Sequence, residues 1–330
     1  MLLAGDIGGT KTLLGLFERD GDRPRQLVVR EYATLDFDSL DELTNVFLDD
    51  TGAAASVAVV CIGVAGPVTG LAARLTNVPW IVDAAALAER LGDCPVQLLN
   101  DLEAMAYAVS VLEPDEVAVL QEGVAVAGGN AAIIAAGTGL GESLLHNVDG
   151  QFIPSASEGG HADFSARTPR ELALVEYLTG IYGRAENDRV ISGPGLVNLF
   201  RFTHGVTGAS TRRACAAVGH GVEESELPAA ISASAMTARC EQCVESLDMF
   251  IEAYGAEAGN LALRSMATAG VYLGGGIAPK VLPALESGAF LEAFCSKAPL
   301  TDLLRTIPVS VILNPAAGLV GAAVRASALT

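Results

Sequence analysis

The sequence predicts an α/β protein of two related domains that face each other across a cleft. The chain has 330 residues, which exceeds the roughly 250 to 300 at which single hydrophobic cores stop growing. A buried strand, a glycine turn and a return strand occur twice, at residues 2–18 and again at residues 130–147. Strands and helical patterns alternate between these two openings, which is typical of α/β architecture. Two similar openings therefore indicate two related domains.

The first predicted domain covers residues 1–111 together with residues 314–330. Its apolar runs predict strands at 2–5, 12–18, 28–33, 56–64 and 96–99. Helical spacing predicts helices at 39–49, 84–91, 104–111 and 316–328. Pro114 lies beside the boundary. The last helix is rich in small residues, and we expect it to cross back onto the first domain.

The second predicted domain covers residues 112–313. Strands are predicted at 130–136, 142–147, 269–273 and 309–313. Helices are predicted at 170–182 and, as one long apolar-periodic helix, at 235–264.

Composition and charge exclude several classes of protein. The chain is 51% hydrophobic, and its 20 basic and 39 acidic residues give a net charge of −19. Such a charge repels nucleic acids and anionic membrane surfaces. Asp6 comes too early for a secretory leader, and no apolar run reaches membrane-spanning length. We therefore expect a cytoplasmic protein with no nucleic-acid or membrane partner.

Six cysteines are scattered along the chain and do not form a disulfide framework, so reduced thiols are expected. Only Cys240 and Cys243 have a spacing used by metal or redox sites. A zinc site needs a second pair of ligands, and a redox site needs a thioredoxin-like context. The sequence shows neither, which favours a structural role for both cysteines.

Three glycine turns follow apolar strands: Gly5-Asp6-Ile7-Gly8-Gly9-Thr10, Gly137-Thr138-Gly139-Leu140-Gly141 and Gly274-Gly275-Gly276. Glycine lets backbone N–H groups approach a phosphate closely. Any one such turn is more often a plain hairpin, but three together favour a nucleotide site, although none matches the P-loop. Asp6 could hold magnesium directly or through water, and Thr10 and Lys11 could donate to phosphates.

Two polar pairs are candidates for binding and catalysis. Asn100 and Asp101 follow a predicted strand and precede a predicted helix, so Asp101 could act as a general base, or the pair could cap the helix. Glu158 and His161 suit the recognition of sugar hydroxyls, but could also be zinc ligands or a surface pair.

Beyond these features, the chain resembles the bacterial glucokinase family, within the hexokinase, Hsp70 and actin fold group, over nearly its whole length. The resemblance rests on the first two glycine turns and on further motifs in matching order: Leu75-Thr76-Asn77-Val78-Pro79-Trp80, Leu99-Asn100-Asp101-Leu102-Glu103-Ala104, Glu158-Gly159-Gly160-His161, Ser192-Gly193-Pro194-Gly195-Leu196 and Gly274-Gly275-Gly276-Ile277. It implies two ribonuclease H-like, actin-like ATPase domains.

The resemblance also implies an activity, which is ATP-dependent phosphorylation of glucose at its 6-hydroxyl, the first step of glycolysis. Asn100 and Asp101 are then expected to bind the sugar, with Asp101 as the base, and Glu158 and His161 to bind its hydroxyls. ATP and Mg²⁺ are expected at the glycine turns, with Asp6 at the metal. The residues expected at the nucleotide are Gly5, Asp6, Ile7, Gly8, Gly9, Thr10, Gly137, Thr138, Gly139, Gly275 and Gly276.

The sequence departs from the family at one sugar ligand. Asp188 stands where the family has glutamate, and Glu186 lies two residues earlier, so either could contact the sugar. The related ROK kinases follow the histidine with a cysteine-rich zinc motif, but here no cysteine follows His161 until Cys215, so no zinc is expected. The resemblance suggests a homodimer.

Three alternatives remain at this point. The chain could be a kinase for another hexose or an aminosugar. It could also be a non-enzymatic sugar-sensing regulator, although the first phosphate-loop glycine, Gly5, leaves no room for a preceding DNA-binding motif. A third alternative is an ATPase of the actin or Hsp70 type, but the filament-forming or peptide-binding additions of those proteins are not found in the sequence.

Overall fold

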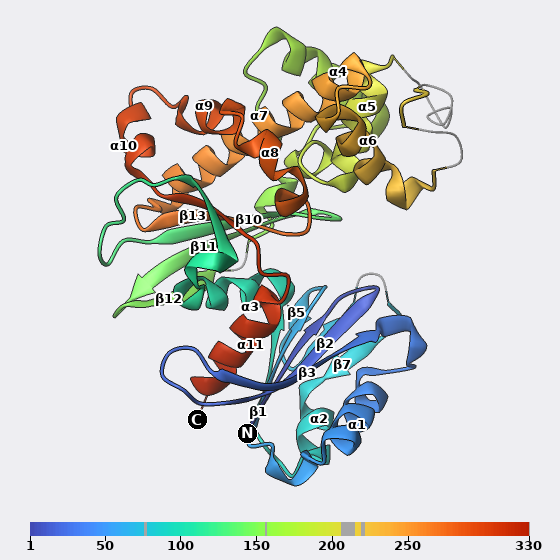
Figure 1. Ribbon diagram of the computed structural model, residues 1–330, viewed down its shortest axis with the longest axis vertical. Helices are drawn as coiled ribbons and strands as arrows, with labels where there is room; N and C mark the ends of the chain where they lie inside the picture. The colour runs from blue at the N-terminus through green and yellow to red at the C-terminus, as the bar shows by residue number, and fades with distance from the viewer. Residues whose placement is uncertain (76–77, 156, 206–214, 219–221, 330) are drawn as a thin grey trace. The chain divides into compact units, whose positions relative to one another are not determined.

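The computed structural model describes residues 1–75, 78–155, 157–205, 215–218 and 222–329. The chain forms two compact units (Figure 1). The first comprises Met1–Glu116, Gln151–Ser155 and Asn314–Thr330, and the second Val117–Gly150 and Ala156–Leu313. Thr76 and Asn77 of the motif at 75–80 lie outside the described residues.

The first unit is built on a five-stranded sheet in the order β3-β2-β1-β4-β8. Its strands are β1 (Leu2–Ile7), β2 (Lys11–Glu18), β3 (Arg25–Ala33), β4 (Val59–Val64) and β8 (Val96–Asn100). β1 pairs antiparallel with β2 and parallel with β4, and β4 pairs parallel with β8. A small antiparallel sheet contains β5 (Val68–Thr69), β6 (Ala72–Arg74) and β7 (Ile81–Asp83).

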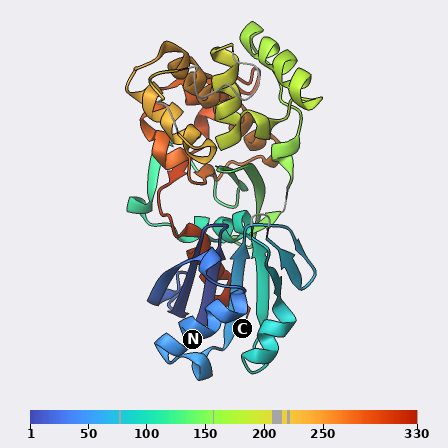
Figure 2. The ribbon, with the colours of Figure 1, turned by 90° about the vertical axis from the view of Figure 1, so that its right-hand side faces the viewer.

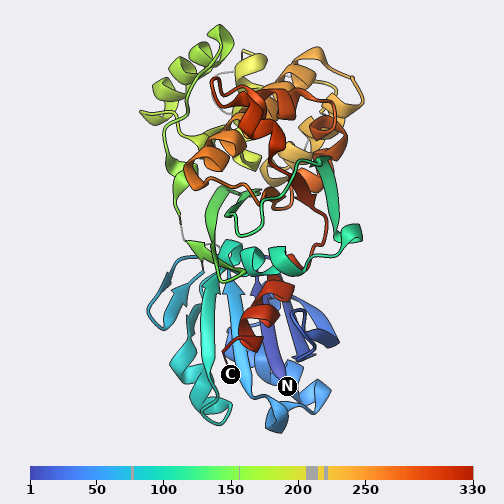
Figure 3. The same ribbon diagram turned by 90° about the vertical axis from the view of Figure 1, so that its left-hand side faces the viewer.

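Alternate residues of the strands face opposite sides of this sheet, as the two-residue period of a strand requires. Leu3 and Ile7 of β1 pack in a cluster with α1 (Leu40–Thr51) and α2 (Ala84–Arg90). Leu2 and Ala4 pack in the other cluster, which includes residues of α3 (Asp101–Ala108) and α11 (Ala317–Ser327). α11 lies in front of the strands in Figure 3 and behind them in Figure 2. The sheet is therefore covered on both faces.

The second unit repeats the opening of the first. β10 (Ala131–Ala136) pairs antiparallel with β11 (Leu140–Val148) and parallel with β13 (Gly270–Gly274). β14 (Val309–Ile312) and β9 (Val117–Gln121) complete the order β11-β10-β13-β14-β9. β12 (Gln151–Ser155) is counted with the first unit. This repeated pairing confirms the prediction of two related openings.

The helices of the second unit surround one large apolar core. They are α4 (Pro169–Tyr182), α5 (Gly193–Thr203), α6 (Leu227–Met236), α7 (Glu241–Ser265), α8 (Leu282–Leu285), α9 (Ala289–Cys295) and α10 (Thr301–Thr306). α7 crosses the sheet, where the fully buried Tyr254 donates its hydroxyl to the Ile134 carbonyl at 3.1 Å. Burying that hydroxyl without a partner would be unfavourable, so the contact fixes the position of α7.

The single long helix predicted at 235–264 is wrong. α6 ends at Met236, Ala238 adopts a left-handed φ of 50°, and α7 begins after its N-cap residue Cys240. The apolar periodicity runs through the break without glycine or proline, so the sequence gives no local stop signal. Within the described part of the chain, no helix combines the length and the apolar character needed to cross a membrane.

Candidate active site

The first glycine turn joins β1 to β2. The Gly8 N–H donates to the Lys11 carbonyl at 2.9 Å and closes the turn. Thr34, which directly follows β3, stabilises this turn. The Thr34 hydroxyl donates to the Gly8 carbonyl at 2.9 Å, and the Thr34 N–H donates to the Thr10 carbonyl at 3.1 Å. A pocket of about 210 Å³ opens over this turn, lined by Asp6, Gly8, Thr10, Lys11, Leu13 and Pro315. The turn is thus rigid, and its surface is concave.

Asp6 carries the carboxylate of this pocket. Burial of the group, and next the nearby charge of Asp101, raise its pKa from 3.8 to about 6, against the opposing effect of Lys11. The start of α11 approaches the same carboxylate so closely that a Cβ on Gly318 would lie 2.7 Å from Asp6 Oδ2. A partly dehydrated carboxylate that lines a pocket is suited to bind a cation or the water shell of a cation.

Asn100 and Asp101 lie at the carboxyl end of β8. The neighbouring strands β1 and β4 run parallel to β8, so their ends place Asp6, Gly66 and Asp101 at one edge of the sheet. Asn100 is also the N-cap of α3: its Oδ1 accepts from the Leu102 N–H at 3.0 Å, and the Glu103 carboxylate accepts from the Asn100 N–H. Its Nδ2 donates to the Gly66 carbonyl at 3.3 Å. The capping alternative is therefore confirmed, and it orients the residue that precedes Asp101.

Asp101 has the properties of a base that is accessible and only partly hydrated. Its side chain is exposed by surface area. Protein atoms packed around it nevertheless raise its pKa by desolvation, against hydrogen bonds from Leu102, from its own backbone and from Asn100. A raised pKa strengthens a carboxylate as a proton acceptor.

The other two glycine turns lie together in the second unit. β10 and β13 are parallel neighbours, so the turn at 137–141 and the turn at 274–276 leave the same edge of the sheet. Gly275 has a φ of 81°, and a Cβ there would lie 2.3 Å from the Ala136 carbonyl oxygen. Only glycine fits this contact without strain. The Gly193 N–H donates to the Gly137 carbonyl at 2.8 Å, which ties the first of these turns to the start of α5.

In the second unit, Glu158 precedes the short 3₁₀ turn Gly159–His161 and His161 ends it, and both side chains are exposed. His161 Nδ1 lies 3.4 Å from the largely buried carboxylate of Glu186. Glu186 also pairs with Arg184 at 3.6 Å and with Arg189 at 3.2 Å. A carboxylate network thus orients the predicted sugar ligand His161.

Asp188 has a different partner. Its Oδ1 accepts from the Leu140 N–H at 2.7 Å, and so the carboxylate holds the glycine turn at 137–141. Of the two acidic residues that the sequence offered for the sugar, Glu186 lies beside His161 and Asp188 beside the turn. The local sequence could not distinguish them, because the contact between residues 140 and 188 depends on tertiary structure.

The sequence reasoning missed three residues around these loops: Thr34 and Gly318 in the first unit, and Glu142 in the second. Glu142 is 1% exposed, and its Oε1 has no hydrogen-bond partner within the described ranges. A Cβ on Gly159 would lie 2.3 Å from its Oε2. Burial, and next the nearby Glu257, raise its pKa from 4.5 to about 7. A glutamate directly after the glycine turn at 137–141 was the available signal.

The two related α/β units carry glycine turns of the phosphate-binding type, a strand-end carboxylate and a histidine–carboxylate pair. Together these features define a sugar kinase of the actin-like ATPase fold class. The glucokinase family profile matches residues 3–329. A glucokinase of Trichormus variabilis is 38% identical over 340 residues, covering 100% of this chain and 99% of the relative. One of Stenotrophomonas maltophilia is 36% identical over 333 residues, covering 99% and 95%. The chain belongs to the glucokinase family.

Solved structures agree with the assignment of the fold. The crystal structure of a glucokinase from an Antarctic psychrotroph matches with a TM-score of 0.87 at 28% identity, covering 99% of this chain and 98% of that one. A ROK family glucokinase from Streptomyces griseus, in complex with glucose and AMPPNP, matches with a TM-score of 0.62 at 23% identity, covering 99% of each chain, which shows a shared fold. These findings confirm the family resemblance and the predicted fold class.

Proposed function

We propose that this protein transfers the γ-phosphoryl group of ATP to the 6-hydroxyl of glucose, with Asp101 as the general base. The observation that carries the proposal is the common sheet edge of the first unit, where the Asp6 turn ends β1 and the Asn100–Asp101 pair ends β8, with β4 parallel between them. Membership of the glucokinase family supports the choice of substrate and donor.

The chemical step is an in-line displacement. The sugar O6 forms a bond to the γ-phosphorus while the bond from that phosphorus to the β–γ bridging oxygen breaks, and ADP leaves. The O6 proton passes to the Asp101 carboxylate. General-base groups of this kind contribute about 10²- to 10⁴-fold to the rate. Most of the remaining acceleration comes from positioning and charge stabilisation.

The residues present fit Mg·ATP. The N–H groups of the three glycine turns are the proposed phosphate ligands, and the closely packed backbone at Gly275 leaves no space for a side chain. The Asp6 carboxylate would hold the magnesium ion, directly or through water, in the pocket over the first turn. When bound, the ion neutralises charge on the phosphates. The glycolytic role, a cytoplasmic location and a homodimer are proposed with it, on the family resemblance alone.

Sugar recognition is assigned to Asn100, Glu158 and His161, with Glu186 holding His161. Asp188 is then a positioning residue for the nucleotide turn, through Leu140. These two roles predict different kinetic effects. Glu186→Gln should raise the KM for glucose, whereas Asp188→Asn should raise the KM for ATP. If Asp188→Asn raised only the glucose KM, Asp188 would be the sugar ligand.

An ADP-release assay with ATP and magnesium, run across several hexoses and aminosugars and without sugar, tests the activity. We expect turnover with glucose and a rate fall of about 10²- to 10⁴-fold in Asp101→Asn. Asp20→Asn, at an exposed carboxylate away from the sheet edge, is the matched control. Near-normal turnover in Asp101→Asn would refute the assignment of the base, and a stronger response to another sugar would correct the substrate.

A further inference from the structure

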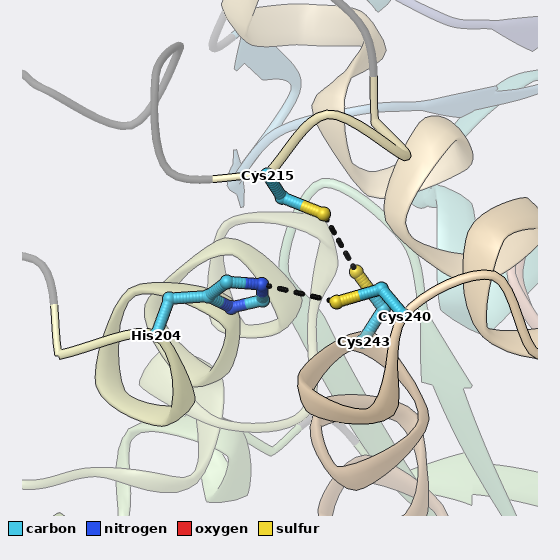
Figure 4. Close-up of side chains that lie close together, drawn as sticks. All are labelled: His204, Cys215, Cys240 and Cys243. Atoms are coloured by element: carbon cyan, nitrogen blue, oxygen red, sulfur yellow. Dashed lines mark hydrogen bonds between the residues drawn. The ribbon is translucent and has the colours of Figure 1, made fainter.

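Four metal-binding side chains gather in the second unit, and the proposed kinase reaction uses none of them. They are His204, Cys215, Cys240 and Cys243, and their ligand atoms all lie within 4.8 Å of one another (Figure 4). The whole chain has only 4 histidines and 6 cysteines. Half of the cysteines and one of the histidines therefore meet at a single point, and Figure 4 shows their side chains directed toward one another.

We propose that these four residues form a structural zinc site, a function beyond the kinase reaction. Zinc prefers four nitrogen and sulfur ligands in a tetrahedron, with bonds of about 2.3 Å to sulfur and about 2.0 Å to nitrogen. The edges of that tetrahedron are about 3.8 Å between two sulfurs and about 3.6 Å between sulfur and nitrogen. Cys215 Sγ lies 3.9 Å from Cys243 Sγ, and Cys240 Sγ lies 3.5 Å from His204 Nε2.

The local structure directs each ligand toward the same point. Cys240 is the N-cap of α7 and Cys243 lies in its first turn, so the spacing of three residues brings both thiols to one side of the helix start. The Cys-Glu-Gln-Cys segment alone lacked a second ligand pair, and the fold supplies it.

His204 supplies the nitrogen with the geometry that a metal ligand needs. It follows α5 as its C-cap, and its Nδ1 lies 2.9 Å from the Phe200 carbonyl, to which it can donate. That hydrogen bond places the proton on Nδ1 and leaves the Nε2 lone pair facing Cys240, the arrangement typical of histidines bound to zinc. The Phe200 ring lies 4.0 Å from the imidazole and holds its orientation.

The site would be closed and structural. Cys215 and Cys243 are buried, and Cys240 and His204 are half-buried. Four protein ligands fill a tetrahedron and leave no position for substrate. Thr203 Oγ1 lies 2.8 Å from Ser246 Oγ, so the end of α5 and the start of α7 are already linked beside the cluster. A bound zinc ion would also tie the segment that carries Cys215 to these two helix ends.

The sequence led us to expect no zinc in this protein, and the proposed site departs from that expectation. That expectation rested on a missing cysteine-rich motif, whereas the cluster uses residues that lie 11, 25 and 3 positions apart along the chain. A disulfide is the chemical rival, since two of the sulfurs are close. It would use two thiols and would give no role to His204 and the third cysteine.

The first experiment uses the full-length protein as purified, in reducing buffer without chelator. Zinc measured by mass spectrometry is expected at about one ion per chain, with release when the thiols are modified by a mercurial reagent. Replacement by Co²⁺ should give the intense visible d–d bands of a tetrahedral thiolate site. X-ray absorption should give about three sulfurs and one nitrogen around zinc.

Variants separate the cluster from the other thiols. Cys240→Ser should lower zinc affinity by about 100-fold or more, whereas Cys295→Ser, at a half-buried cysteine outside the cluster, should leave zinc content unchanged. If Cys240→Ser failed to fold, the cobalt spectrum of the unmodified protein would decide. A protein that takes up no zinc under reducing conditions, or that holds a Cys215–Cys243 disulfide instead, would overturn the proposal. The metal content is measured without the kinase assay, so either proposal can fail alone.

Discussion

Replacing Glu142 by glutamine is expected to change how the stability of the second unit depends on pH. The carboxyl group is 1% exposed, and burial, with the nearby Glu257, raises its pKa from 4.5 to about 7. Glu257 is itself held by Arg264 and by Asn260, whose Nδ2 donates to it at 2.9 Å. Burial without an ion-pair partner among the described residues therefore favours the protonated form of Glu142.

The direction in which stability changes with pH follows from proton binding. The folded protein binds this proton more tightly than the unfolded chain, so the stabilisation is fully present below about pH 4.5 and is lost as pH rises through about 7. The difference of the two pKa values, at about 1.4 kcal/mol for each pH unit, is about 3 kcal/mol. Between pH 4.5 and 8 the unmodified protein should lose about 3 kcal/mol more unfolding free energy than Glu142→Gln.

Urea titration followed by far-UV circular dichroism at several pH values measures this difference. Tryptophan fluorescence does not serve, because the single tryptophan, Trp80, lies in the core of the first unit. Glu176→Gln, at an exposed position of α4, is the matched control and should keep the pH dependence of the unmodified protein. An identical pH dependence in Glu142→Gln would refute the reasoning.

Three further predictions concern single positions. The pKa of about 6 at Asp6 predicts that kcat/KM for Mg·ATP is constant above pH 6 and falls about tenfold for each pH unit below it. The reason is that the protonated carboxyl group cannot hold magnesium. A pH profile that stays flat down to about pH 5 in steady-state assays would contradict this prediction. Gly275→Ala should raise the KM for ATP at least about tenfold, because the φ of 81° at Gly275 and the nearby Ala136 carbonyl both oppose a side chain. An unchanged KM for ATP would show that the turn does not hold the nucleotide. Gly321→Ala should destabilise the first unit by about 3 kcal/mol, because its Cβ would lie 1.7 Å from the Ala104 oxygen where α11 crosses α3. Urea unfolding followed by Trp80 fluorescence measures it. The control Gly180→Ala, in α4 of the second unit with no neighbour within 4 Å, is followed by far-UV circular dichroism and should not destabilise the protein.

Local patterns in the chain predicted most of the elements. The hairpins at β1–β2 and β10–β11 and the strand that ends at Asn100 follow from short apolar runs next to glycine or a capping residue. The join between α6 and α7 was missed, because apolar residues continue through the left-handed residue Ala238. Periodicity reports which face is buried, and a face can stay buried across a break in the helix.

The candidate site divides in the same way. Asp6, Asp101 and the three glycine turns could be selected from residue type and position in the chain, since each follows an apolar run that predicts a strand. Residue type and chain position could not predict that Asp188 holds the turn at 137–141, or that Gly318 approaches Asp6. These contacts join residues that are far apart in sequence, and no local pattern encodes them.

The sequence by itself determined the family, the repeated hairpin openings and the residues that carry the proposed chemistry, because strand periodicity, glycine turns and motif order are local properties. Only the tertiary structure decided that β1, β4 and β8 bring Asp6 and Asp101 to one edge, that Glu142 is buried beside Glu257, and that His204 meets three cysteines. Sheet order and helix packing bring distant segments together, and the free energy that selects them comes from burying whole faces of strands and helices at once.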